Sequence, residues 1–234
     1  MMLHLAYCGT QLGISKEYIM LDVRRNIDNY LSDNSSIGRY SSFDYCYNYF
    51  QSFYERNEIA DIAKQENREM SCLQLAFYLA SWGMLRGSSF LLQRSMKYYE
   101  PVIEVIAHMG ADTWNIDVDA YSDKNIDMLL ACEEEIAQAI GQGRNVSIIL
   151  TTKIMLGVFG NIPAFDTYFR SGFGIHTLSR KSLHRIAQFY QDHKYIIDEY
   201  HIPTIDFATG QNSHRYYPKA KLIDMIGFIA GGTN

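Results

Sequence analysis

The residues most suited to binding or catalysis lie between Ile136 and Arg170, where two glycines separate two predicted helices. Gly141 and Gly143 enclose Gln142, and apolar residues at helical spacing lie on both sides. Closely spaced glycines let the backbone turn tightly. The amides at the start of the second helix would then point outward and, with the helix dipole, form a seat for a phosphate group. Such a hairpin binds a nucleic-acid backbone without reading its bases.

A carboxylate follows the second predicted helix. Asp166 comes after a short segment that opens with Phe159-Gly160 and contains Pro163. An aspartate just before a further segment is often its N-cap, because its side chain accepts hydrogen bonds from the first free amides. The carboxylate is also a group that can perform acid–base or electrostatic catalysis.

This order of features resembles the helix-hairpin-helix DNA glycosylases of the endonuclease III type. In that family a Leu-Pro-Gly-Val-Gly hairpin leads into a helix that ends near Phe-Gly, and a short loop then reaches Val-Asp-Thr-His-Val. The corresponding segments here are Ile140-Gly141-Gln142-Gly143-Arg144, Phe159-Gly160 and Phe165-Asp166-Thr167-Tyr168-Phe169. An apolar helix, a turn and a helix that closes at Tyr98-Tyr99-Glu100-Pro101 also match the family's order, so the resemblance spans roughly Ser71 to Arg170.

The resemblance implies an enzyme that flips a damaged or modified base out of DNA and hydrolyses its N-glycosidic bond. Asp166 takes the position of the family's catalytic aspartate. It would stabilise the oxocarbenium-like sugar and orient or deprotonate the attacking water. The expected phosphate-binding residues are Gly141, Gly143, Arg144 and Asn145. The expected base pocket contains Trp82, Arg86 and Tyr168. Two alternatives stay open: Trp82 also fits a core position, and Arg144 also fits a solvent-exposed position after a turn.

The departures from the family pattern also carry predictions. The hairpin lacks its proline, and the following helix is about one turn longer than in the family. Asn145 occupies the position of the Schiff-base lysine of bifunctional members, so we expect a monofunctional enzyme without strand-nicking activity. Lys153 lies two turns further along the helix and is either an accessory residue or an ordinary surface lysine. No four cysteines lie near the C-terminus to hold an iron–sulfur cluster, and we expect no cofactor.

Two other functions fit parts of the sequence. A helical protein can keep the hairpin as a non-catalytic module that binds DNA or another protein. Arg170 and His176 loosely match the Arg-and-His motif of HEPN-like ribonucleases, although Gly172 and Gly174 interrupt a segment that should be helical there. Both a repair role and a defence role against modified foreign DNA are compatible with the glycosylase reading.

The elements that must position these residues are predicted to be helices. Alternating strand patterns are scarce, and apolar periodicity predicts an all-α, compact multi-helix fold of about eight to ten helices, with two helical lobes flanking a cleft as one arrangement. We expect residues 1–234 to form one unit with a glycosylase-like core at 71–170, completed by C-terminal helices at 171–234. The predicted helices are Glu17–Leu31, a strongly aromatic Tyr40–Tyr54, Ser71–Leu85, Phe90–Glu100, Pro101–Met109, Asn125–Ile140, Asn145–Val158, Leu178–Tyr200 and Ala220–Ala230.

Composition and charge limit the choice of function. The net charge of −5 argues against binding nucleic acid over the whole surface. The segment from Thr167 to the end, however, contains eight Lys and Arg residues and only five acidic residues, which is compatible with a local basic face. The acidic stretch Ala111–Asp123 lacks the glycine and glutamate of an EF-hand, and we interpret it as a solvated loop without metal.

The remaining sequence features indicate an intracellular protein. The four cysteines are scattered and form no zinc-ligand spacing, which favours reduced thiols in a reducing compartment. The first residues lack the basic region and long apolar run of a signal peptide. Apolar runs are far shorter than the roughly 20 residues that cross a bilayer. We therefore expect a cytoplasmic monomer whose partner is DNA with a damaged or modified base, not a membrane.

Overall fold

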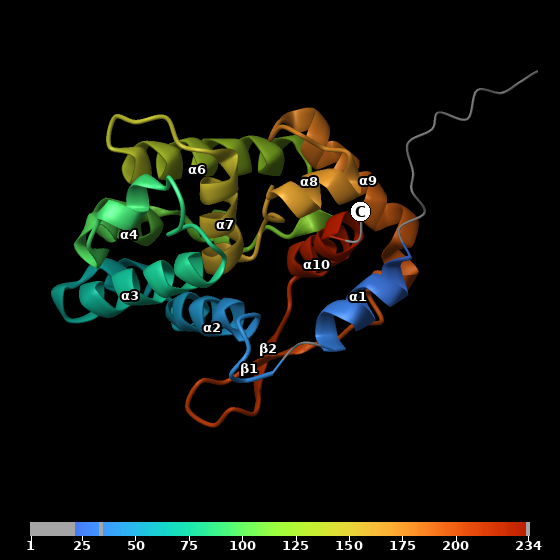
Figure 1. The fold of residues 1–234 in the computed structure, drawn as a ribbon, viewed down its shortest axis with the longest axis horizontal. Coiled ribbons are helices and arrows are strands. Elements are labelled where there is room, and N and C mark those ends of the chain that lie inside the picture. The colour runs from blue at the N-terminus through green and yellow to red at the C-terminus, as the bar shows by residue number, and fades with distance from the viewer. Residues whose placement is uncertain (1–21, 33–34, 233–234) are drawn as a thin grey trace, which may run out of the picture.

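A computed structural model describes residues 22–32 and 35–232 of the chain, and within these ranges the protein is almost entirely helical (Figure 1). This confirms the predicted all-α fold. The described part contains ten α-helices, which falls within the predicted range. The α-helices are α1 (Val23–Ser32), α2 (Ser41–Glu55), α3 (Gln65–Ser81), α4 (Glu100–His108), α5 (Ala111–Trp114), α6 (Asp123–Gly141), α7 (Ile148–Phe159), α8 (Thr167–Phe173), α9 (Arg180–Ile197) and α10 (Lys219–Gly232). Four 3₁₀ segments and two strands complete them: η1 (Ile59–Ala63), η2 (Phe90–Gln93), η3 (Met96–Tyr99), η4 (Val118–Ala120), β1 (Pro203–Ile205) and β2 (Asn212–Tyr216).

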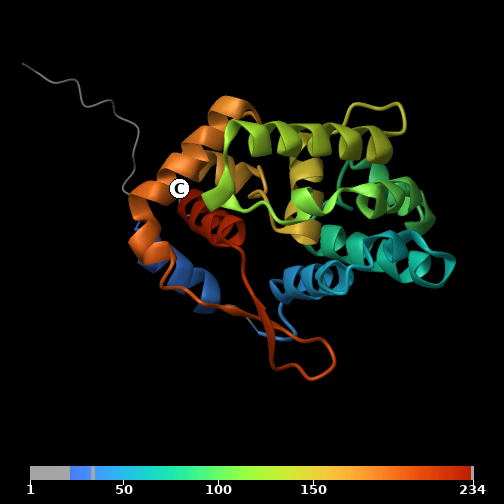
Figure 2. The same ribbon diagram turned by 180° about the vertical axis from the view of Figure 1, so that it is seen from behind.

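Helix α7 lies at the centre of the molecule. Its sequence is apolar on every side, and every residue from Leu150 to Phe159 is buried. Helix α6 runs across one end of it, α2 and α3 lie at its other end with α4 between α3 and α6, and α1, α8, α9 and α10 form a second group (Figures 1 and 2). The first and last described helices, α1 and α10, pack against each other although they lie at opposite ends of the sequence. The part of the predicted first helix before residue 22 lies outside the described residues.

The junction between α6 and α7 differs from the prediction. The second helix begins at Ile148 and not at Asn145, so six residues separate it from Gly141. Gln142 and Gly143 both have left-handed backbone angles, with φ of 46° and 86°. The chain then runs extended to Ser147, which caps α7 by accepting a hydrogen bond from the amide of Leu150. The amides of Gly143 and Asn145 therefore do not belong to the first turn of α7.

Two other predicted helix boundaries are wrong, for local reasons. Helix α3 ends at Ser81 and not at Leu85, because Gly83 adopts a left-handed φ of 76° and ends the helix. The predicted helix Phe90–Glu100 is instead the two 3₁₀ segments η2 and η3. Helix α4 begins at Glu100 and Pro101 lies in its first turn, where the missing N–H of proline costs nothing.

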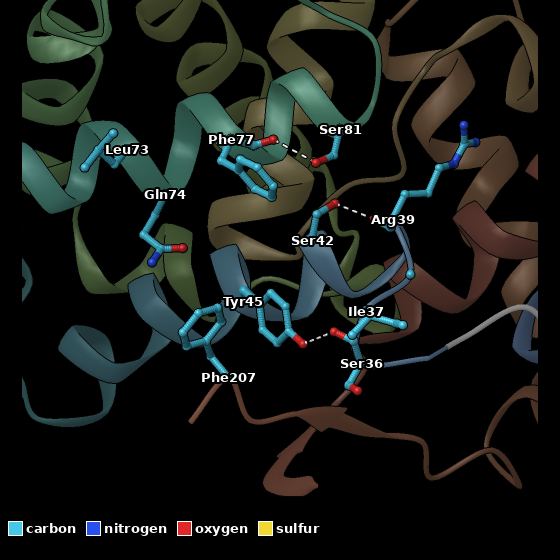
Figure 3. A pocket seen from close by; sticks show the side chains of 11 residues that line it. Ser36, Ile37, Arg39, Ser42, Tyr45, Leu73, Gln74, Phe77, Ser81 and Phe207 are labelled. Atoms are coloured by element: carbon cyan, nitrogen blue, oxygen red, sulfur yellow. Dashed lines mark hydrogen bonds between the residues drawn. The ribbon is translucent and has the colours of Figure 1, made fainter. Parts of the chain in front are cut away.

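The small antiparallel sheet formed by β1 and β2 is absent from the predicted elements. Its strands are three and five residues long and lack a clear apolar alternation. Together with α2 and α3, the loop between the strands borders a groove, which we call the aromatic groove (Figure 3). The main apolar residues lining the aromatic groove are Ile37, Tyr45, Leu73, Phe77 and Phe207.

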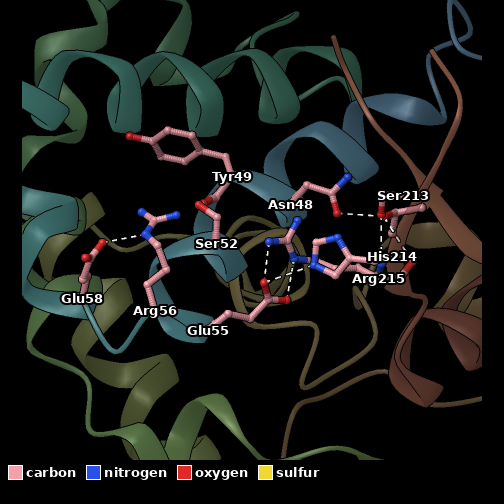
Figure 4. Close-up of polar contacts among 10 residues, drawn as sticks. Asn48, Tyr49, Ser52, Glu55, Arg56, Glu58, Ser213, His214 and Arg215 are labelled. Carbon is pink, nitrogen blue, oxygen red and sulfur yellow. Dashed lines mark hydrogen bonds and ion pairs between the residues drawn. The ribbon is translucent and has the colours of Figure 1, made fainter. Parts of the chain in front are cut away.

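Polar contacts attach the sheet to α2 (Figure 4). The guanidinium of Arg215 binds both carboxylate oxygens of Glu55, at 2.7 and 2.6 Å. His214 approaches the same carboxylate at 3.4 Å. Burial by itself would raise the pKa of Glu55, but Arg215 and His214 together outweigh it and hold this pKa below its usual value. The side-chain amide of Asn48 donates to the carbonyl of Ile205 at 2.9 Å. These contacts fix the sheet beside the aromatic groove.

Glycines allow α8 and α10 to approach closely. A Cβ on Gly231 would overlap the carbonyl oxygen of Tyr168, and a Cβ on Gly172 would overlap the carbonyl oxygen of Gly227. The pattern of two glycines four residues apart, Gly227 and Gly231, lets the two backbones touch, as small residues do wherever helices pack closely. Helix α10 therefore sets the position of α8, which begins directly after Asp166.

Within the predicted acidic loop, Asp117 is a half-buried capping residue. Its carboxylate accepts hydrogen bonds from the amides of Val118, Lys219 and Ala220 at 2.7, 2.7 and 2.8 Å, and so joins this loop to the start of α10. No group of three or more His, Cys, Asp or Glu side chains suited to a metal ion occurs among residues 22–32 and 35–232. The described cysteines, Cys46, Cys72 and Cys132, are buried free thiols.

The carboxyl of Asp117 makes stability depend on pH. Burial raises the pKa of Asp117 to about 6, and burial likewise raises that of Asp44 to about 6. Between about pH 4 and pH 6 the unfolded chain loses these protons while the folded protein keeps them, so the free energy of unfolding falls as pH rises. For Asp117, the fall is about 3 kcal/mol. Urea denaturation from pH 4 to 7 should show a flatter profile for Asp117→Asn than for the wild type, and parallel profiles would contradict the assignment.

Candidate functional site

Five of the predicted site residues surround one pocket of about 360 Å³. It lies where the turn after α3, the middle of α7, the start of α8 and the side of α10 meet. The predicted residues at the pocket are Trp82, Arg86, Lys153, Asp166 and Tyr168. We call this cavity the Asp166 pocket. Its lining also includes Arg39, Met84, Thr167 and Phe228, which the sequence analysis did not select.

Asp166 uses its two carboxylate oxygens for different contacts. Oδ1 accepts a hydrogen bond from the amide of Phe169 at 2.9 Å, which makes Asp166 the N-cap of α8. Oδ2 lies 3.0 Å from Nζ of Lys153. The side chain is 14% exposed, so it is held from both sides and still reaches the pocket. The capping role and a chemical role are therefore compatible in the same residue.

Lys153 is not an ordinary surface lysine. Its side chain is only 5% exposed and projects from α7 toward Asp166. The ammonium also lies 5.0 Å from the ring centroid of Trp82, a distance at which a cation is attracted to an indole face. Charged side chains are almost never fully buried unless they are paired, and here the partner is Asp166.

The segment before Asp166 is held at two consecutive amides. The amide of Phe165 donates to Oγ1 of Thr152 at 2.9 Å, and the amide of Ala164 donates to Oδ1 of Asp224 at 3.0 Å. Thr152 belongs to α7 and Asp224 to α10. The backbone that carries the carboxylate is thus fixed by side chains from two different helices.

A second buried ion pair lies behind the pocket. Nζ of Lys221 is 3.1 Å from Oδ2 of Asp224 and 2.9 Å from the hydroxyl of Tyr30. Burial raises the pKa of Asp224, and the Lys221 ammonium opposes that rise. The sequence analysis did not select this pair. A lysine and an aspartate three residues apart in the apolar segment Lys221–Ala230 were a usable signal, since isolated buried charges are rare.

Trp82 lies at the end of a stack of three aromatic rings. The ring of Tyr30 stacks on Tyr40 at 4.3 Å between centroids, and Tyr40 stacks on Trp82 at 5.6 Å with nearly parallel planes. The ring of Phe228 meets Trp82 edge-on at 5.7 Å. The indole Nε1 is buried and has no hydrogen-bond partner among the described residues. Trp82 therefore fits both interpretations of the sequence, a core position and a pocket position, since it packs against the core and also lines the pocket.

Arginine and tyrosine side chains form the more open side of the pocket. The guanidinium carbon of Arg39 lies 5.1 Å from the Trp82 ring centroid. Arg86 is exposed, and Tyr168 is 48% exposed with its ring edge-on to Phe228 at 5.1 Å. Three cationic side chains, those of Arg39, Arg86 and Lys153, therefore line the pocket together with one carboxylate.

The hairpin residues lie away from this pocket. Gly141 is buried, whereas Gly143, Arg144 and Asn145 are exposed, and none of the four lines the Asp166 pocket. Arg144 lies against two aromatic residues, 3.4 Å from the hydroxyl of Tyr98 and 6.0 Å from the ring centroid of Phe90.

The Arg-and-His motif of the ribonuclease alternative does not form one helix. Helix α8 ends at Phe173, and Gly174 follows with a left-handed φ of 61°. Arg170 therefore lies in α8, whereas His176 lies beyond its end and is exposed.

In the described ranges, no helix has the length and apolar character needed to cross a membrane.

The chain matches no model of a protein family, no curated protein and no solved structure.

Proposed function

We propose that this protein is a monofunctional DNA glycosylase-like enzyme that hydrolyses the N-glycosidic bond of a damaged or modified base. The observation that carries the proposal is the Asp166 carboxylate, fixed at the wall of a small pocket by Lys153 at 3.0 Å and by the first turn of α8. The pocket volume of about 360 Å³ lies near the lower end of the range for small-molecule sites, roughly 300–1,000 Å³. A single planar base suits that size.

The proposed reaction places positive charge on the sugar and negative charge on the departing base. Asp166 would stabilise the oxocarbenium-like sugar and accept a proton from the attacking water. The water oxygen forms the new bond to C1′, and the electron pair of the broken C1′–N bond leaves with the base, which then takes up a proton. The cations of Arg39 and Arg86 would favour the departing base, because they line the same pocket.

DNA would be held partly by the exposed hairpin. Arg144 and Asn145 lie on the six-residue loop between α6 and α7, where they can reach phosphates without entering the pocket. Backbone contacts of this kind position a nucleic acid and carry no sequence information. The base itself would be recognised by Trp82, Tyr168 and the arginines in the pocket.

The test is a base-release assay on a panel of single-stranded and duplex DNAs that each carry one damaged or modified base. Abasic sites are then cleaved with alkali, and Asp166→Asn is the control. We expect release by the wild type and not by the variant, with strand breaks only after alkali. Breaks without alkali would overturn the monofunctional assignment and make Lys153 the candidate amine nucleophile. DNA binding without release from any substrate would instead favour a non-catalytic binding module.

A further inference from the structure

The aromatic groove carries several exposed apolar side chains close to the Asp166 pocket. Ile37 is 97% exposed, Phe77 is 69% exposed and Phe207 is 77% exposed, so these side chains contribute little to the core. A group of exposed apolar residues around one hollow usually marks a binding surface. The groove has a volume of about 600 Å³, larger than the Asp166 pocket.

The groove has ring faces on its walls and polar groups at its rim (Figure 3). Tyr45 is held by its hydroxyl, which donates to the carbonyl of Ser36 at 2.5 Å, and Phe207 meets it edge-on at 5.1 Å. Phe77 extends from α3, and Gln74 lies one turn before it. Nucleobases need this combination, since their faces stack on aromatic rings and their edges form hydrogen bonds.

The groove is continuous with the Asp166 pocket. Arg39 and Ser81 line both cavities. Within the described part of the chain, Arg39 is the single charged residue that lines the groove, and its guanidinium carbon lies 5.1 Å from the Trp82 ring centroid in the neighbouring pocket. A phosphate that links a base in one cavity to a base in the other would pass this cation. Among residues 22–32 and 35–232, no acidic residue lines the groove, which also suits a polyanion.

We propose that the aromatic groove holds unstacked bases next to the target nucleotide, so that the substrate is single-stranded or locally melted DNA. This inference rests on the proposed function, because it takes the Asp166 pocket as the site of the target base. Bases inside a duplex hide their faces in the stack, whereas bases of a single strand can lie on exposed aromatic rings. The groove therefore selects unpaired DNA.

The first experiment measures the binding of two fluorescent 12-mers by anisotropy, one of thymidines and one of abasic spacers with the same phosphates. The wild type should prefer the thymidine oligonucleotide. Phe77→Ala and Phe207→Ala should each weaken its binding by at least about fivefold, the effect of losing one base–aromatic stack, and leave the spacer oligonucleotide unaffected. Tyr195→Ala is the matched control, since this tyrosine is 70% exposed on α9 and lines neither cavity.

Several results would overturn the inference. These are equal binding of the two oligonucleotides by the wild type, no binding of either, or an unchanged preference in both phenylalanine variants. A wild-type dimer that Phe77→Ala dissociates, with oligonucleotide binding unchanged, would assign the groove to self-association instead. Circular dichroism checks that each variant is folded.

A second measurement separates this inference from the proposed function. The base-release assay is run on single-stranded and duplex DNA with the wild type and with Phe77→Ala. Base preference that depends on Phe77, without base release from any substrate, would support the groove and reject the glycosylase. Base release that is as fast from duplex as from single-stranded DNA, and unchanged in Phe77→Ala, would support the glycosylase and reject the groove.

Discussion

Asp166→Asn is expected to lower the rate of base release by at least about 10²- to 10³-fold, because an amide cannot stabilise the cationic sugar as a preorganised charge does. The same substitution leaves the ammonium of Lys153, with its side chain 5% exposed, without its carboxylate. Breaking a buried ion pair costs about 3–5 kcal/mol. We therefore also expect a lower free energy of unfolding, although asparagine remains a good N-cap for α8. Initial rates of base release and urea denaturation on one preparation measure both effects.

The control for this prediction is a double-mutant cycle. Lys153→Met should destabilise the protein by a similar amount, because it leaves the carboxylate of Asp166 unpaired. The double variant Asp166→Asn/Lys153→Met removes both charges and should recover much of the lost stability, but no base release. Additive losses of stability would contradict a coupled pair. Full release by a folded Asp166→Asn protein would show that the carboxylate is not catalytic.

Gly231→Ala is expected to destabilise the protein by about 3 kcal/mol or more, near the upper end for overpacking. The new Cβ would overlap the carbonyl oxygen of Tyr168, and backbone cannot move aside as a flexible side chain can. A loss of this size lowers the melting temperature by about 6–12 °C in a protein of this length. Because α8 would be displaced from α10, base release should fall together with stability. Thermal unfolding followed by circular dichroism measures the change.

The neighbouring glycine provides the matched control. Gly232 ends the same helix, and a Cβ there would meet nothing closer than the Tyr168 ring at 3.9 Å. Gly232→Ala should therefore leave stability unchanged or raise it slightly, because alanine favours the helix. Equal effects of the two alanine substitutions would show that the close approach of α8 and α10 does not limit stability.

The helices that were predicted well are those with a strong local signal. In α6, Ser122 caps the start, apolar residues repeat at helical spacing, and Gln142 ends the helix in a left-handed conformation. For α7 the predicted helix Asn145–Val158 starts three residues too early, whereas its end lies within one residue of Phe159. The sheet was missed because its strands are short and are held to α2 by side chains such as Glu55, far away in the sequence.

The candidate site was predicted only in part. Asp166 and Trp82 could be selected from the sequence. The burial of Lys153 could not, because it depends on the path of the segment before Asp166, and side chains of Thr152 and Asp224 hold that segment in place. Arg39 reaches the pocket from a segment more than 120 residues before Asp166, and no local pattern links the two. Contacts of this kind depend on how helices pack, so a period of 3.6 residues cannot predict them.

The amino-acid sequence is enough to predict that the chain is helical, where its apolar faces lie, and that a glycine-containing turn joins two helices that are followed by an isolated aspartate. These properties arise from interactions between residues a few positions apart. The pairing of Asp166 with Lys153, the Lys221–Asp224 pair behind them and the aromatic groove beside the pocket all depend on the tertiary structure. The physical reason is burial. A buried charge is costly unless it is paired, and its partner can come from any segment that the fold brings close.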